Sequence, residues 1–206
     1  MDELPKRRIW LPSSGFLVFL GVGVVISALA IPGLRSSQRA SNERSASTTL
    51  KTLTSAEADF RANDRDGNGV NDFWTGDVSG LYYVRPAGSG PEIKLIELDA
   101  ANADARPLFP LAQGTMPKAG YSYKALDRDD SFKGSEGEYK RDTDKSGRKV
   151  HHEGKFGFCA FPKSDSEGKY VFYVNENNTI FREAGTKAKD AFPDDSSLKS
   201  YWSKID

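Results

Sequence analysis

The stretch FLVFLGVGVVISALAI, residues 16–31, decides how the rest of the chain is interpreted. It holds no charged residue and one polar side chain, Ser27, and the basic cluster 6–8 (Lys-Arg-Arg) precedes it. A backbone inside lipid must satisfy its own hydrogen bonds, so such a stretch is expected to be helical. About 20 apolar residues span a bilayer, with about 17 as the lower limit. We therefore predict a transmembrane helix over residues 16–33, preceded by a basic leader, residues 1–15.

The apolar side chains of this helix form the predicted membrane anchor. They are Phe16, Leu17, Val18, Phe19, Leu20, Val22, Val24, Val25, Ile26, Leu29 and Ile31. The basic cluster favours a cytoplasmic N-terminus, which predicts a single-pass protein of the cell inner membrane with a periplasmic or extracytoplasmic head. Two other interpretations of the stretch stay open. One is a signal peptide cleaved after Ala28-Leu29-Ala30, and the other is an uncleaved signal anchor.

A second helical pattern follows the anchor. Ala46, Leu50, Leu53 and Phe60 are spaced by four, three and seven residues, which places them on one face of a helix. Polar and charged residues occupy the other faces, and Asn63-Asp64 is the first turn-forming cluster. The pattern predicts an amphipathic helix over residues 34–62 that joins the anchor to a globular head, residues 63–206.

This N-terminal region resembles type IV pilins and type II secretion pseudopilins. The resemblance rests on Gly15-Phe16, the apolar run and the segment 30–35 (Ala-Ile-Pro-Gly-Leu-Arg), and on the pilin-like helix sequences at 45–53 and 56–58. Residues 119–126 and 156–162 are also similar to the C-terminal part of pilin-like proteins. The resemblance implies cleavage of the leader between Gly15 and Phe16 and assembly with other pilin-like subunits into homo- or hetero-oligomers. Leu20 stands at the fifth position after this cleavage point, where the family carries Glu.

The composition restricts the function further. The chain of 206 residues carries 29 basic and 29 acidic side chains, so nothing in its charge favours nucleic acid as a partner. A single cysteine, Cys159, allows no internal disulfide and is expected to be a buried small hydrophobe. Hydrolase, zinc-protease and phosphate-loop motifs are missing from the sequence. We predict neither an enzyme nor a small-molecule substrate.

The head shows a coarse order of elements. Strand patterns cover 81–84, 121–126, 156–161, 170–174 and 179–182, with Asn177-Asn178 as a tight turn before the last of them. A short helix is expected over 93–105 and another over 196–204, the latter capped by Asp194 or Asp195. The segment 127–154 is almost wholly polar and predicts a long exposed loop. A long helix followed by mostly antiparallel strands and a short C-terminal helix indicates an α+β fold.

An acidic segment directly after the long helix has the spacing of a calcium-binding loop. Asp64, Asp66 and Asn68 alternate, Gly69 stands sixth and Asp72 ninth. Ca²⁺ takes six to eight oxygen ligands, so the backbone carbonyl of Val70 is a further candidate. Thr75 stands where an EF-hand has Glu, which leaves Asp77 or water to complete the site within residues 64–77. The alternative is a polar Asn/Asp/Gly turn without a metal.

Other residues of interest have plainer interpretations. Phe73-Trp74 and Trp202 are expected in the core. His151-His152 are adjacent within the polar segment and lack metal-ligand spacing, which favours a surface loop. The sequence therefore predicts a membrane-anchored pilin-like or pseudopilin-like structural subunit of a type II secretion or type IV pilus-type envelope assembly. The alternative is a single-pass, membrane-tethered extracytoplasmic binding domain that is stabilised by calcium and does not polymerise.

Overall fold

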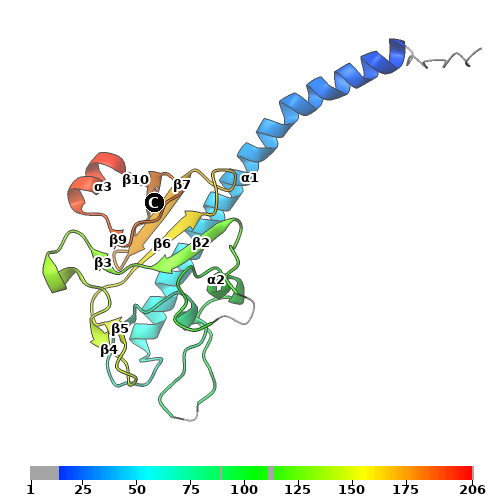
Figure 1. The fold of residues 1–206 in the computed structure, drawn as a ribbon. Helices are drawn as coiled ribbons and strands as arrows, with labels where there is room; N and C mark the ends of the chain where they lie inside the picture. Colours follow the sequence, from blue (N-terminus) through cyan, green and yellow to red (C-terminus); the bar gives the residue numbers. More distant parts are fainter. Residues whose placement is uncertain (1–13, 89, 111–113, 206) are drawn as a thin grey trace, which may run out of the picture. The chain divides into compact units, whose positions relative to one another are not determined.

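The protein has an α+β fold with a mostly antiparallel main sheet, as the order of elements predicted (Figure 1). The computed structural model describes residues 14–88, 90–110 and 114–205, with side chains from residue 33 onward except that of residue 201. Residues 1–38 and 39–206 form two separate units. The second unit contains both apolar clusters and every strand.

The long helix α1 spans Ser14–Ala62, and its side chains are described from Gly33. Within residues 39–62 the predicted apolar face is confirmed: Ala46, Leu50 and Leu53 are fully buried, and Phe60 is 1% exposed. The helix ends at Ala62, directly before the predicted turn-forming cluster. The helix boundary and its buried face therefore follow from the sequence pattern alone.

The predicted membrane anchor, residues 16–33, has all but the last of its side chains outside the described part of the chain. The same holds for the proposed processing site, Gly15 and Phe16. Where the structure does describe side chains, it contains no helix that combines the length and apolar character needed to cross a membrane.

The main sheet has five strands in the order β10-β8-β7-β6-β2, and every neighbouring pair is antiparallel. The strands are β2 (Tyr121–Ala125), β6 (Gly157–Pro162), β7 (Tyr170–Asn175), β8 (Phe181–Ala184) and β10 (Ser203–Lys204). The predicted strands 121–126, 156–161 and 170–174 are thereby confirmed, whereas the fourth begins two residues later than expected. Asn178, in the turn between β7 and β8, adopts a left-handed φ of 56°.

Successive side chains of the central strand β6 point to opposite faces of the sheet. Phe158 and Ala160 belong to the larger apolar cluster, which also contains the buried face of α1. Cys159 belongs to the smaller cluster on the other face, where Leu198 and Trp202 pack. The core roles expected for Cys159 and Trp202 are confirmed, since they are 0% and 9% exposed.

Three predicted elements differ from the structure. The segment around Leu81 forms the 3-10 helix η1 (Ser79–Leu81) instead of a strand, and only an isolated bridge joins Val84 to Ile93. The helix expected over 93–105 shrinks to α2 (Leu98–Asn102). The last helix, α3 (Asp195–Tyr201), is capped by Asp194 as predicted but ends early, because the following residues enter β10. In all three cases the local pattern is too short to decide between competing backbones.

The prediction of one long exposed loop over 127–154 is wrong. The segment contains β3 (Arg128–Asp129), the 3-10 helix η2 (Gly134–Gly137), β4 (Asp142–Thr143) and β5 (Lys149–His152). Strand β5 pairs with β4 and with β1 (Phe73–Trp74), and β3 runs parallel to β9 (Ala191–Phe192). Strands of two to four residues are too short to show an alternating pattern, so composition alone suggested a loop.

Candidate functional site

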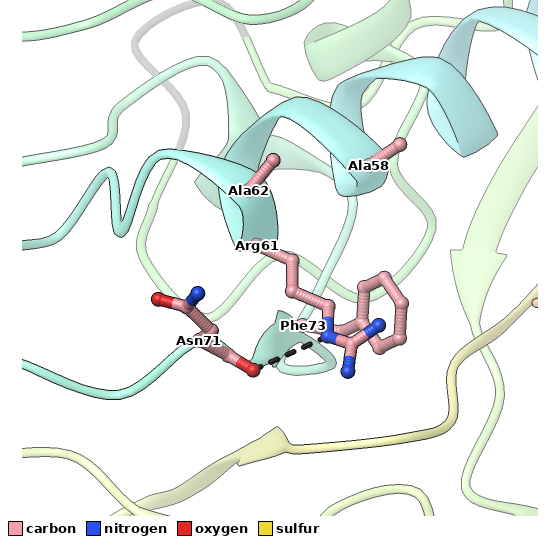
Figure 2. A pocket seen from close by; sticks show the side chains of 5 residues that line it. All are labelled: Ala58, Arg61, Ala62, Asn71 and Phe73. Carbon is pink, nitrogen blue, oxygen red and sulfur yellow. Dashed lines mark hydrogen bonds between the residues drawn. The ribbon is translucent and has the colours of Figure 1, made fainter.

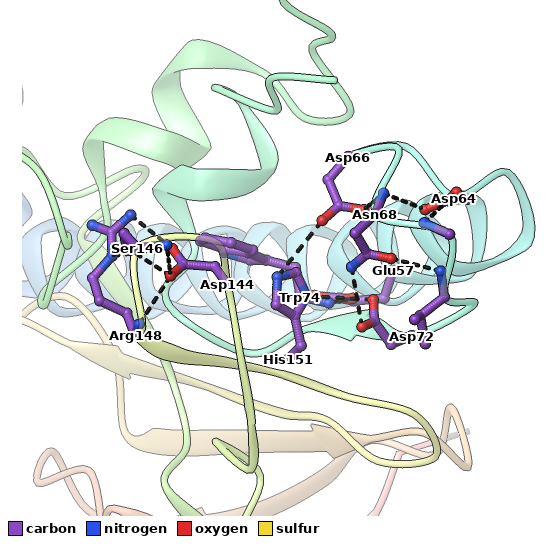
Figure 3. A network of polar contacts seen from close by, with 12 residues as sticks. Glu57, Asp64, Asp66, Asn68, Asp72, Trp74, Asp144, Ser146, Arg148 and His151 are labelled. Atoms are coloured by element: carbon purple, nitrogen blue, oxygen red, sulfur yellow. Dashed lines mark hydrogen bonds and ion pairs between the residues drawn. The ribbon is translucent and has the colours of Figure 1, made fainter. Parts of the chain in front are cut away.

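The acidic segment 64–72 folds into a tight loop at the C-terminal end of α1 (Figure 3). Its backbone takes left-handed φ angles at Asp64 (43°), Gly67 (64°) and Gly69 (85°). An aspartate tolerates this conformation better than most residues, and glycine adopts it at no steric cost. The Asp64 carbonyl also accepts a hydrogen bond from the Gly67 amide at 2.9 Å. The composition of the segment therefore explains its sharp turn.

The alternating polar side chains of the loop turn back onto its own backbone. Asp64 accepts hydrogen bonds from the amides of Asn68, at 3.1 Å, and Gly69, at 3.0 Å. Asn68 accepts from the amide of Val70 at 2.6 Å and donates to Asp72 at 3.4 Å. Five predicted ligand positions, namely Asp64, Asp66, Asn68, Val70 and Asp72, are thus held in one small loop.

His151 lies against this loop from strand β5. Its Nδ1 is 3.3 Å from Asp72 Oδ1, and its Nε2 is 3.7 Å from Asp66 Oδ2. The imidazole is stacked near Phe60 and meets the edge of Trp74, with ring centroids 6.2 and 5.4 Å away. Burial by itself would lower the pKa of His151, but the neighbouring Asp72 and then Asp66 raise it above its ordinary value. The two carboxylates therefore favour the protonated form of His151, and burial opposes it.

The surface-loop prediction for the histidine pair is wrong. His151 is 2% exposed and His152 is 8% exposed, and both lie on strand β5. Consecutive residues of a strand point to opposite faces of the sheet. His151 therefore lies on the face of its partner Trp74, and His152 lies on the face of its partner Phe73. The pairing register, which the sequence does not display, brings His151 to the acidic loop.

Glu57 is a buried acid on the last part of α1 that the sequence analysis did not select. It is fully buried, and its Oε2 accepts a hydrogen bond from the Trp74 amide at 2.9 Å. Its other oxygen has no hydrogen-bond partner among the described residues. Burial raises the pKa of Glu57 well above its ordinary value, the Trp74 hydrogen bond opposes this, and the charge of Asp72 adds to it. A neutral, protonated Glu57 is the form that this environment favours.

Asp77, the remaining predicted ligand, is engaged elsewhere. Its carboxylate accepts hydrogen bonds from the amides of Gly80 and Leu108, the Ser79 hydroxyl and the Trp74 indole. All four donors lie outside residues 64–72. Asp104 binds the amides of Val78 and Ser79 beside it, which makes this acidic pair a clamp on the start of η1. We therefore leave Asp77 out of the candidate ligand set.

A hollow lies beside the end of α1 on the face of the small sheet that carries Phe73 (Figure 2). Its apolar part, of about 290 Å³, is lined by Ala58, Arg61, Ala62, Asn71 and Phe73. The Arg61 guanidinium lies over the Phe73 ring at 5.0 Å from the centroid, and its Nε donates to the Asn71 carbonyl at 3.2 Å. These two contacts fix Arg61 at the wall of the hollow.

The polar part of this hollow has a volume of about 450 Å³. Its lining consists of Arg61, Arg141, Asp142, His152, Glu153 and Gly154. Arg61 lines both parts, and Phe73 of the first part is paired with His152 of the second, so the two parts are neighbours. The lining comes from α1, the segment entering β4, and the end of β5, which are joined only in the folded chain.

Known proteins give no guide to this arrangement. Comparisons with protein-family models, with curated proteins and with solved structures found no match for the chain. Across residues 14–88, 90–110 and 114–205, no three or more His, Cys, Asp or Glu side chains are grouped so that they could hold a metal ion.

Proposed function

We propose that the protein is a membrane-anchored, pilin-like structural subunit of a type II secretion or type IV pilus-type envelope assembly. One observation carries the proposal: an antiparallel sheet covers the C-terminal part of a long N-terminal helix, and that helix continues from an uncharged apolar sequence. In this proposal residues 16–33 lie in the inner membrane, the N-terminus is cytoplasmic and the head is periplasmic.

The packing of α1 suits this role. Leu50 and Leu53 are fully buried in the same apolar cluster as Phe158 and Phe172 of the sheet. Burial of a leucine side chain contributes about 2 kcal/mol, so several such contacts attach a helix firmly to a sheet. The head is attached in this way to the part of α1 within residues 39–62.

The first part of α1 with described side chains, residues 33–37, offers a place for contact with sister subunits. Leu34 is 69% exposed, and residues 33–37 are exposed throughout. In water this leucine buries little apolar surface, whereas a neighbouring helix would cover it. We place the inter-subunit contact at this part of α1.

Cysteine cross-linking tests the assembly. The native Cys159 is buried, so Leu34→Cys introduces an accessible thiol into the full-length chain. We expect oxidation of membranes carrying Leu34→Cys to give disulfide-linked dimers. The matched control is Lys145→Cys, in an exposed turn of the head, which should stay monomeric. Equal cross-linking of both variants, or none for Leu34→Cys, would contradict the proposed helix contact.

The alternative is a tethered binding domain that is stabilised by calcium and does not polymerise. The acidic loop favours it, because the side-chain oxygens of Asp64, Asp66 and Asn68 all accept hydrogen bonds from the amides of one tight turn. The carboxylates are not grouped closely enough to hold a metal ion in the described residues, so calcium would have to draw them together. Asp72 is 4% exposed, and its Oδ1 makes no hydrogen bond within the described residues, although His151 Nδ1 lies 3.3 Å away from it. Burial raises the pKa of Asp66, and the charges of Asp72 and Asp64 add to this rise although His151 opposes it. A cation would relieve this repulsion between carboxylates.

The calcium proposal assigns Asp64, Asp66, Asn68, Asp72 and the carbonyl of Val70 as ligands. The His151 imidazole already lies against two of these carboxylates, and their charges favour its protonated form, so only modest calcium affinity is expected. We expect millimolar Ca²⁺ to raise the melting temperature of the wild-type protein. Asp66→Asn should abolish the rise, and Asp165→Asn, in an exposed turn, should keep it. An unchanged melting temperature together with no calorimetric heat would remove calcium from the account.

A further inference from the structure

The two-part hollow beside the end of α1 carries unsatisfied hydrogen-bond donors. The Arg141 guanidinium makes neither an ion pair nor a hydrogen bond within the described chain, and Arg61 uses only its Nε. Arginine presents several donors in a planar fork that matches a carboxylate. Two guanidinium groups therefore line the polar part with free capacity for an acceptor.

His152 supplies a further donor to the same place. Its Nδ1 accepts hydrogen bonds from the amides of Gly154, at 2.9 Å, and Lys155, at 3.0 Å. Burial is the main cause that lowers the pKa of His152, so the ring is neutral at physiological pH. With Nδ1 serving as acceptor, the proton of the neutral ring is on Nε2. This N–H has no acceptor in the described part of the chain, although the residue is 8% exposed and lines the hollow.

The remaining lining limits which anion fits. Asp142 and Glu153 stand in the polar part together with the two arginines, so the site offers little net positive charge. A doubly charged phosphate would be repelled by both acids. A peptide carboxylate carries one charge, and the backbone N–H groups around it can donate to the acids. The adjoining apolar part, formed by Ala58, Ala62 and Phe73, would take an apolar side chain next to the carboxylate.

We propose that this hollow binds an acidic segment of a partner protein, in which an apolar residue adjoins a glutamate or aspartate. Arg61 and Arg141 clamp the carboxylate, the Nε2–H group of His152 donates to it, and the apolar neighbour rests on Phe73. A volume of about 290 Å³ next to one of about 450 Å³ suits two or three residues of a peptide rather than a large surface. This inference is independent of polymerisation, because the lining residues all belong to the head and the end of α1.

Calorimetric titration of the full-length protein in detergent tests the proposal. The probe is acetyl-Gly-Leu-Glu-Gly-amide, compared with the same peptide carrying Gln for Glu, the same peptide carrying Gly for Leu, and inorganic phosphate. We expect the acidic probe to bind, with each replacement weakening it. Loss of a bidentate charged contact should weaken binding at least about tenfold, so Arg141→Gln should show that reduction. Arg141 is exposed, so this variant should fold normally.

Arg85→Gln is the matched control, because the Arg85 side chain is 84% exposed and lies outside the hollow. It should bind the acidic probe as the wild type does. Equal affinity for the Glu and Gln peptides, unchanged binding by Arg141→Gln, or no binding of the acidic probe would overturn the proposal. Phosphate binding as strong as peptide binding would reduce the site to a simple anion site. Self-association abolished by Arg141→Gln would reassign the occupant to a second copy, which also overturns it.

Discussion

The middle and the end of the described helix are stabilised by different kinds of contact. Around Leu50 and Leu53 the helix adds apolar side chains to a cluster that it shares with the sheet. Nearer its end the helix contributes the buried acid Glu57, and its Phe60 packs against the buried His151, which in turn contacts Asp72 of the acidic loop. Apolar packing tolerates some exchange of shape, whereas a buried polar group needs its own partner. The comparison teaches that one amphipathic helix can serve as a rigid support at one point and as the wall of a polar site at another.

The largest effect is expected at the apolar middle of the helix. Leu53→Ala removes a fully buried side chain and leaves a cavity, which should lower the free energy of unfolding by about 2–5 kcal/mol. Urea denaturation measures this change. The matched control is Leu34→Ala, the same chemical change at a 69% exposed position, which should have a small effect. Similar losses of unfolding free energy in both variants would contradict the difference between the buried and the exposed parts of α1.

The pH dependence of stability tests the clamp at η1. Burial, and then the charge of Asp77, raises the pKa of Asp104 from 3.8 to about 6. The folded state therefore binds this proton more tightly than the unfolded state, and Asp104 stabilises the protein most when it is protonated. Its contribution should fall by about 3 kcal/mol as the pH rises from about 4 to above 6.

Denaturation of wild-type protein and Asp104→Asn at several pH values isolates this contribution. Glu57 and Asp66 have raised pKa values of the same sign, but they act in both proteins. The unfolding free energy of the wild type minus that of Asp104→Asn should therefore fall with rising pH, because only the wild type loses stability as Asp104 ionises. A difference that is constant from pH 4 to 7 would show that Asp104 titrates in its ordinary range.

The polar end of the helix gives a smaller effect with its own signature. Glu57→Ala leaves the buried Trp74 amide without its acceptor, which should cost about 1–3 kcal/mol. Glu57→Gln keeps that acceptor and resembles the neutral acid, so its unfolding free energy should lie within about 1 kcal/mol of the wild type. Chemical denaturation at pH 7 compares them. An equal loss in both variants would indicate that Glu57 is ionised and bound to a cation or another donor.

The smallest effect concerns the turn between β7 and β8. Asn178 has a left-handed φ of 56°, which glycine adopts freely and alanine does not. Asn178→Ala should cost about 1 kcal/mol, while Asn178→Gly should be nearly neutral. Thermal melting of the two variants side by side measures the difference. If alanine were tolerated as well as glycine, the turn would differ from the one described.

The parts of the fold that follow from sequence are those with a long, regular pattern. The buried face Ala46, Leu50, Leu53 and Phe60 extends over several turns, and β6 and β7 are mostly buried, largely apolar runs of six residues each. A pattern of this length predicts the type of element even where single residues would suit either a helix or a strand. Strand β5 was missed because its four residues, Lys149–His152, sit among charged neighbours and owe their burial to pairing with β1 and β4.

The candidate sites divide in the same way. The acidic loop was visible because its ligand spacing lies within nine consecutive residues, Asp64–Asp72. The contributions of Glu57 and His151 were not visible in the sequence. Glu57 lies on the helix seven residues before the loop, and His151 lies far after it and reaches it only through the pairing register of its strand. A buried glutamate on the apolar side of the predicted helix was the one available signal for Glu57. Nothing in the sequence joins Arg61 to Arg141 and His152, whose common hollow exists only in the folded chain.

The intact mass and N-terminal sequence of the protein from its native membrane test the central proposal most directly. We predict a mature chain that begins at Phe16, after removal of residues 1–15. Gly15→Leu should block this processing, and Gly23→Leu, within the apolar stretch, should leave it intact. A native chain that begins at Met1, or one that begins beyond Ala30, would contradict the pilin-like account.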